Sequence, residues 1–217
     1  KSAGEYKKEK IQILYKHYNQ QKFTLVLEEA NELLKLYPKE IDIYNVQGAA
    51  SAAMKNFRKA IDCYIEITKI KSNSANAFFN IAVMYYSLNL PENAIKNYNE
   101  AIRNQPEYAD AYNNLGGALI AQGKVKDGAN NYQKAIDINP NFADAHNSLG
   151  NIFRKLKQRD KALICFERAH AIDPNMNYIF GSLLSSKMHL CQWDELSSQL
   201  QELRTRINNN EKVIGSF

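Results

Sequence analysis

A period of 34 residues, such as the step from Ala75 to Ala109, runs through most of this 217-residue chain and limits its fold more than any other feature. Five consecutive copies cover residues 7–40, 41–74, 75–108, 109–142 and 143–176 without insertion or deletion. Numbered within a copy, position 4 is usually aromatic, positions 8 and 20 small, position 24 aromatic and position 32 proline. A period of this length predicts a stack of similar structural units rather than one central core.

Each copy contains two stripes with the spacing of a helix. Positions 4, 7, 8 and 11 lie on one side of a first helix, and positions 20, 24 and 27 lie on one side of a second. In the copy from Ala143, the small residues are Gly150 and Ala162, and Phe166 is the aromatic residue at position 24. We expect the small residues to let the helices approach while the aromatic ring fills the space beside them. The sequence therefore predicts an all-α fold of antiparallel helix pairs.

This pattern resembles the tetratricopeptide repeat, a helix-turn-helix unit that stacks into a solenoid. The resemblance implies a right-handed superhelical solenoid of about five full repeats, with the first repeat, 7–40, departing from the pattern as terminal copies do. Residues 1–6 are expected to fray. We expect residues 177–210 to form a degenerate sixth helix pair. Leu184 and Leu196 replace small residues at positions 8 and 20 and should push the two helices apart. Residues 211–217 are expected to start a linker to a further domain.

A second resemblance lies at the end of the chain. The run FGSLLSSKMHLCQW from Phe180 to Trp193, with Asp194 and the final NNNEKVIGSF, is similar to the junction between repeats and catalytic part in bacterial glycosyltransferases of the SPINDLY and O-linked N-acetylglucosamine transferase type. It departs from that family at Ser216, where proline is usual. The resemblance implies that the full-length protein transfers a sugar from a nucleotide sugar to protein hydroxyls, and that these repeats select the acceptor protein.

Composition argues against several other classes. The net charge of +5 comes from interspersed lysines and acids, and no apolar run is long enough for a membrane span. The first residue is Lys1 and no secretion leader follows, so we expect an excised fragment. Three cysteines without metal-type spacing favour a reducing cytoplasm. Because no phosphate loop, nucleophile elbow or carboxylate pair stands out, we expect no catalytic residue, cofactor or metal in this chain, and we interpret His146 as a packed substitute for an aromatic residue.

The expected binding surface is the concave groove lined by the first helices, at positions such as 5, 6, 9 and 12. Asparagine is frequent there, and its amide offers a donor and an acceptor to an extended peptide of any sequence. The candidate residues are Gln12, Asn45, Asn80, Asn113, Asn114, Asn147, Ser148, Asn151 and Arg154. The glycosyltransferase family resembled has an asparagine ladder at position 6, which Asn80 and Asn114 match and Val46 interrupts. The alternative is that these asparagines are simply solvated surface, and both interpretations predict a stable Asn114→Ala variant.

Three functions follow for such a chain. The first is a protein- or peptide-binding scaffold within a larger glycosyltransferase, and the second is a stand-alone adaptor for protein assembly. The third, an RNA-binding helical repeat, is disfavoured because the tyrosines fall mostly at packing positions, so we expect neither nucleic acid nor membrane as a partner. A carboxylate clamp is not predicted, since Asn147 and Val83 occupy positions where basic residues would be needed. A second copy of the chain could dock through the sixth helix pair.

Overall fold

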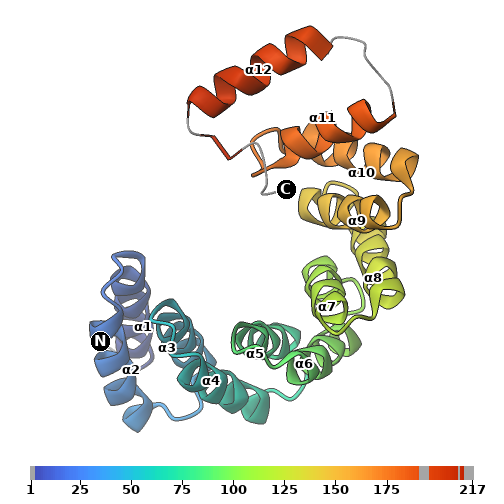
Figure 1. The fold of residues 1–217 in the computed structure, drawn as a ribbon. Coiled ribbons are helices and arrows are strands. Elements are labelled where there is room, and N and C mark those ends of the chain that lie inside the picture. The colour runs from blue at the N-terminus through green and yellow to red at the C-terminus, as the bar shows by residue number, and fades with distance from the viewer. Residues whose placement is uncertain (1–2, 191–195, 210, 213–217) are drawn as a thin grey trace. The chain divides into compact units, whose positions relative to one another are not determined.

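The computed structural model describes residues 3–190, 196–209 and 211–212, and in these ranges the chain forms helices and no strand (Figure 1). The chain divides into two compact units, residues 1–122 and residues 123–217, which are described separately below. The helices of the first unit are α1 (Ala3–Asn19), α2 (Phe23–Leu36), α3 (Ile41–Ala53), α4 (Phe57–Ile70), α5 (Ala75–Ser87), α6 (Pro91–Asn104) and α7 (Ala109–Ala121). Those of the second are α8 (Val125–Ile138), α9 (Ala143–Lys155), α10 (Arg159–Ile172), α11 (Ile179–His189) and α12 (Leu196–Asn208).

The helix boundaries follow the period of the sequence. Successive first helices begin at the same position of each copy, at Ile41, Ala75, Ala109 and Ala143. Successive second helices do the same, at Phe23, Phe57, Pro91, Val125 and Arg159. Within each unit, helices that follow one another in the chain pack side by side. The predicted all-α architecture of consecutive helix pairs is confirmed.

The turn between the two helices of a copy always contains one residue in the left-handed backbone region. These residues are Gln21 (φ 59°), Lys55 (φ 59°), Asn89 (φ 58°), Gly123 (φ 78°) and Lys157 (φ 58°). All occupy position 15 of their copies. Glycine adopts this conformation without steric cost and asparagine with little, so the three copies with Gln21, Lys55 and Lys157 tolerate local strain in order to reverse the chain.

The helices of a copy cross where a glycine faces an aromatic ring, as the sequence predicts. A methyl group on Gly48 would lie 2.9 Å from the ring of Tyr64, and one on Gly150 would lie 2.8 Å from the ring of Phe166. Both rings are buried, Phe166 completely. The contact nearest to each glycine is therefore the aromatic residue at position 24 of its own copy, and the absent side chain at position 8 makes room for it.

A second, unpredicted contact joins one copy to the next. The Tyr44 hydroxyl donates a hydrogen bond to the carbonyl oxygen of Pro38 at 3.2 Å. In the second unit His146 Nε2 donates to the carbonyl oxygen of Pro140 at 3.0 Å. In both cases the ring at position 4 binds the proline carbonyl that ends the preceding copy. His146 thus has a structural partner, which agrees with its interpretation as a substitute for an aromatic residue.

The sixth helix pair packs differently from the others. Helix α12 touches α11 at few positions. Arg206 of α12 instead stacks over the ring of Phe180, 4.8 Å from its centroid, and donates to the carbonyl oxygen of Pro174 at 3.2 Å. Asp194, which looks like an N-cap for this helix in the sequence, lies outside the described residues.

The N-terminal segment is helical from its first described residue. Helix α1 begins at Ala3, and fraying of residues 1–6 stays a prediction. Glu5 lies in the first turn, where a carboxylate complements the helix dipole, and Lys10 lies 5.5 Å from the ring centroid of Tyr6 one turn earlier. These two local interactions favour the first turn of α1.

Candidate functional site

A hollow of about 730 Å³ lies in the second unit, between α9, α11 and α12. This volume is in the range of ligand-binding clefts. Its lining comes from all three helices and includes Asn147, Asn151 and Arg154 of α9, Ser182, Ser185 and Met188 of α11, and Leu200 and Leu203 of α12. The loose packing of α12 leaves this space open, so the degenerate sixth copy creates the hollow.

One wall of the hollow is a polar row along α9. Asn151 Nδ2 donates to the carbonyl oxygen of Asn147 at 3.0 Å and to its Oδ1 at 3.4 Å. Arg154 Nη2 donates to Asn151 Oδ1 at 2.8 Å, and its guanidinium lies 5.6 Å from the centroid of the Phe166 ring. These three residues follow one face of the helix and hold one another in place. The row is therefore ordered before any ligand arrives.

Helices α11 and α12 add apolar side chains to the lining, beside the polar Ser182, Ser185 and His189. Leu184 forms part of the buried floor, while Tyr178, Met188 and Leu200 keep 43%, 42% and 38% of their surface exposed. Large apolar side chains gathered around one hollow with polar groups beside them are typical of a binding surface.

A smaller hollow of about 130 Å³ adjoins the first, because Arg154 and His189 line both. It is also lined by Lys157 in the turn after α9, Arg159 at the start of α10, and Ser186. His189 Nδ1 donates to the carbonyl oxygen of Ser185 at 2.7 Å, which leaves Nε2 for other partners. No carboxylate is among the described residues that line either hollow.

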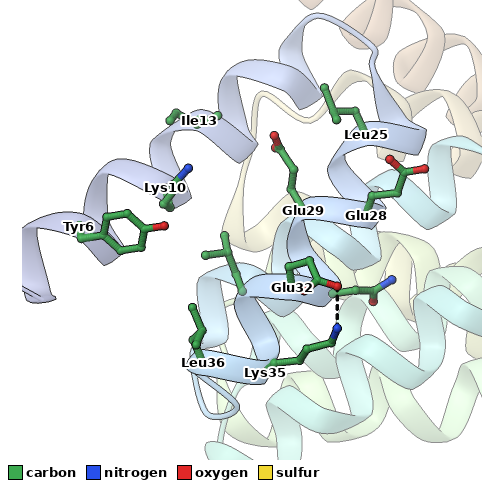
Figure 2. Close-up of a pocket in the computed structure, with 11 residues that line it drawn as sticks. Tyr6, Lys10, Ile13, Leu25, Glu28, Glu29, Glu32, Lys35 and Leu36 are labelled. Carbon is green, nitrogen blue, oxygen red and sulfur yellow. Dashed lines mark hydrogen bonds and ion pairs between the residues drawn. The ribbon is translucent and has the colours of Figure 1, made fainter.

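The first unit has a separate hollow of about 580 Å³ between α1 and α2, shown in Figure 2. Two of its carboxylates have partners, since Lys35 Nζ lies 2.6 Å from Glu32 and His17 Nδ1 lies 2.8 Å from Glu29. None of the predicted site residues lines it. Leu36, an apolar residue of α2, lines this hollow and is 63% exposed.

The predicted site residues separate into two groups. The structure brings Asn147, Asn151 and Arg154 together in the hollow of the second unit. The others line none of these hollows: Ser148 is half-buried in α9, Asn45 and Asn80 are half-buried in α3 and α5, and Gln12 is exposed in α1.

The asparagine pair of the fourth copy has internal partners. The Asn114 side chain hydrogen-bonds the hydroxyl of the buried Tyr98, and Asn113 Nδ2 donates to Asn114 Oδ1 at 3.2 Å. Asn113 Oδ1 is itself buried and has no hydrogen-bond partner in the described part of the chain. Asn114 therefore supports the packing of α6 against α7, and from this bond we expect its removal to lower stability.

Position 6 of the second copy also differs from its expected place in the groove. Val46 is 2% exposed and packs in a core cluster with Leu14, Val26 and Ala30 of the first copy. Because Val46 faces the first helix pair, an apolar side chain packs well at this point of the second copy. The interruption of the asparagine series at Val46 is a consequence of packing.

Chemistry of other kinds finds little support in the described residues. They include no group of three or more His, Cys, Asp and Glu side chains that could hold a metal ion. Burial raises the pKa of the free thiols of Cys63 and Cys165 to about 11, so both stay protonated near neutral pH. No helix in these ranges has the length and apolarity to cross a membrane. Cys191 lies outside the described residues.

Helix pairs that recur at one fixed interval along the chain define a helical-repeat protein. Family profiles identify the repeat: a TPR repeat matches residues 84–123 and 116–156, and a tetratricopeptide repeat matches residues 143–176. The chain therefore contains tetratricopeptide repeats, as predicted. A comparison with the curated proteins found no match.

Several solved structures share this fold. Pseudomonas aeruginosa PilF is 15% identical with a TM-score of 0.80, and the match covers 93% of this chain and 92% of that one. MamA from Desulfovibrio magneticus RS-1 is 18% identical with a TM-score of 0.71, covering 81% and 99%. YrrB, described as a TPR protein with an unusual peptide-binding site, is 17% identical with a TM-score of 0.64, covering 82% and 90%. The similarity extends over nearly the full length of each.

Proposed function

We propose that this chain is a scaffold that binds a segment of a partner protein in the hollow between α9, α11 and α12. The observation that carries the proposal is the convergence of Asn147, Asn151 and Arg154 with exposed apolar side chains around one space. The description of YrrB as a peptide-binding TPR protein supports the same use of this fold.

The two walls would contribute different parts of the binding free energy. In the described part of the chain, Asn147 Nδ2 donates no hydrogen bond, so it can donate to a peptide carbonyl. Met188 and Leu200 can cover an apolar side chain of the peptide and remove it from water. Because the α9 row is already ordered, the peptide would bear most of the ordering cost.

The test is selection of a random displayed peptide library on the chain, followed by affinity measurements with single variants. Asn151→Ala removes a lining amide. Asn131→Ala is its matched control, because Asn131 makes the same bond to the carbonyl four residues earlier, at 2.8 Å from Asp127, but lines neither hollow. Ser182→Trp fills the hollow directly.

We expect the selected peptides to bind Asn151→Ala about 5- to 30-fold more weakly and Ser182→Trp not measurably, with Asn131→Ala equal to the unmodified chain. Circular dichroism melts of each variant confirm folding. Recovery of no peptide, or of peptides that bind all variants equally, contradicts the proposal.

We further propose that the repeats recruit acceptor proteins for a sugar-transferring domain beyond Phe217. The similarity of residues 180–194 to a glycosyltransferase junction supports this, although Cys191 to Asp194 lie outside the described residues. The coding sequence that follows Phe217 provides the test. A nucleotide-sugar-binding domain there fits the proposal, whereas an immediate stop codon contradicts it and leaves the stand-alone adaptor.

Self-association through the sixth helix pair is also proposed. Its support is the exposed apolar surface of Met188 and Ile207, which keep 42% and 44% exposure. Sedimentation of the chain and of an Ile207→Lys variant tests it: a dimer that the variant abolishes is expected, and a monomer at all concentrations contradicts it.

A further inference from the structure

We infer that the peptide recognised by the hollow carries an acidic side chain next to a large apolar one. This inference rests on the proposed function and adds the chemistry of the ligand. The apolar hollow and the small hollow share Arg154 and His189, so a group bound in one lies beside a group bound in the other.

The cations of the small hollow form no ion pair with any described carboxylate. In the described part of the chain, Arg154, Lys157 and Arg159 form no ion pair. Elsewhere exposed cations such as Lys35 and Lys69 pair with glutamates at 2.6 Å. A positive cluster that has no carboxylate among the described residues of its lining complements an anion.

The backbone fixes where these cations meet. Arg154 lies in the last turn of α9, and Arg159 begins α10. Lys157, in the turn between them, has a left-handed backbone conformation. His189 ends α11, which packs against α10. The cluster is therefore built by adjacent elements rather than by one flexible loop.

The apolar hollow decides which kind of anion fits. Leu184, Met188 and Leu200 offer surface to an aliphatic or aromatic side chain, and nucleic acid has no aliphatic side chain to place there. A peptide with leucine or phenylalanine followed by aspartate or glutamate satisfies both hollows at once. The apolar residue supplies most of the affinity, and the acid sets the direction of the peptide.

Synthetic peptides with blocked termini test this, since their charge comes only from side chains. The three probes share a glycine-serine background around one central leucine, which is followed by two glutamates, two glutamines or two lysines. Fluorescence anisotropy measures their affinity at low and physiological salt. The variant Lys157→Glu/Arg159→Glu reverses the cluster, and Lys126→Glu, an exposed lysine of α8 outside both hollows, controls for net charge.

We expect the glutamate peptide to bind about 10- to 100-fold more tightly than the glutamine peptide, as for loss of a hydrogen-bonded charge. The reversed variant should lose this preference and favour the lysine peptide, while Lys126→Glu should change affinity by less than about twofold. Added salt should weaken the glutamate peptide most.

The other outcomes are distinct. Equal binding of the three peptides, weakened by Ser182→Trp, overturns the acidic preference and leaves the proposed function intact. No binding of any peptide, together with an empty library selection, overturns both. Single-stranded oligouridine that displaces the glutamate peptide and loses affinity in the reversed variant overturns the assignment of a peptide as the ligand.

Discussion

The Asn114 side chain of α7 hydrogen-bonds the hydroxyl of Tyr98 in α6, a residue that is only 1% exposed. Burial, only partly offset by this bond, raises the pKa of the Tyr98 hydroxyl. A residue expected on the peptide-binding surface thus also satisfies a buried polar group between two repeats. Asn114 thus has a structural function.

Asn114→Ala should lower the free energy of unfolding by about 1 to 2 kcal/mol, because the Tyr98 hydroxyl loses its partner without regaining water. Urea denaturation followed by circular dichroism measures the change. Tyr98→Phe provides the control: in its background, Asn114→Ala should cost about 1 kcal/mol less. Equal costs in both backgrounds would show that the bond contributes nothing.

Gly150→Ala should destabilise the chain by about 1 to 2 kcal/mol. The new methyl group meets the Phe166 ring at 2.8 Å, and the cost of moving the ring exceeds the gain in helix propensity, which is about 1 kcal/mol. The third copy holds Ala82 at this position, so the fold can adjust. Thermal denaturation checks the cost, and in a Phe166→Leu background the same substitution should be neutral or stabilising.

Lys55→Gly should stabilise the chain by about 0.5 to 1 kcal/mol. Lys55 has a φ of 59°, and relief of the left-handed strain outweighs the added entropy of glycine in the unfolded chain. The reverse change, Gly123→Ala at φ 78°, should destabilise by a similar amount, although no atom lies within 4 Å of the new methyl group. Denaturant midpoints of both variants provide the measurement. The two substitutions should change the free energy of unfolding in opposite directions, and changes of the same sign contradict the prediction.

Stability should fall as the pH rises from about 9 to about 11, because burial raises the pKa of Cys63 and Cys165 from 9.0 to about 11. Below pH 9 both thiols are protonated in either state. Above it, the unfolded chain loses protons that the folded chain retains, which favours unfolding by about 1 to 3 kcal/mol per thiol. Urea denaturation under reducing conditions should show a shallower decline for Cys165→Ala. A parallel decline would assign the effect to other groups.

The fold was predictable because each position of the repeat has one physical requirement. Gly150 and Phe166 could be paired from sequence, since a small residue and a large ring at fixed spacing must face each other across two helices. The left-handed turn was not predictable from four of the five copies, where Gln21, Lys55, Asn89 and Lys157 carry no glycine signal. The residue type at position 15 therefore does not show that the backbone there is left-handed.

The candidate site was only partly predictable. Helical spacing places Asn147, Asn151 and Arg154 on one face, and this part required no tertiary structure. The hollow itself depends on how far α12 lies from α11, and spacing within one helix says nothing about that distance. The partner of Asn114 also lies on another helix, so the sequence alone could not distinguish an inward bond from an exposed amide.

The bonds from Tyr44 and His146 to proline carbonyls make these two joints independent of the proline side chain. A phenol hydroxyl and an imidazole N–H both donate, so either ring can occupy position 4. The acceptor belongs to the backbone, so no side-chain substitution at Pro140 removes it.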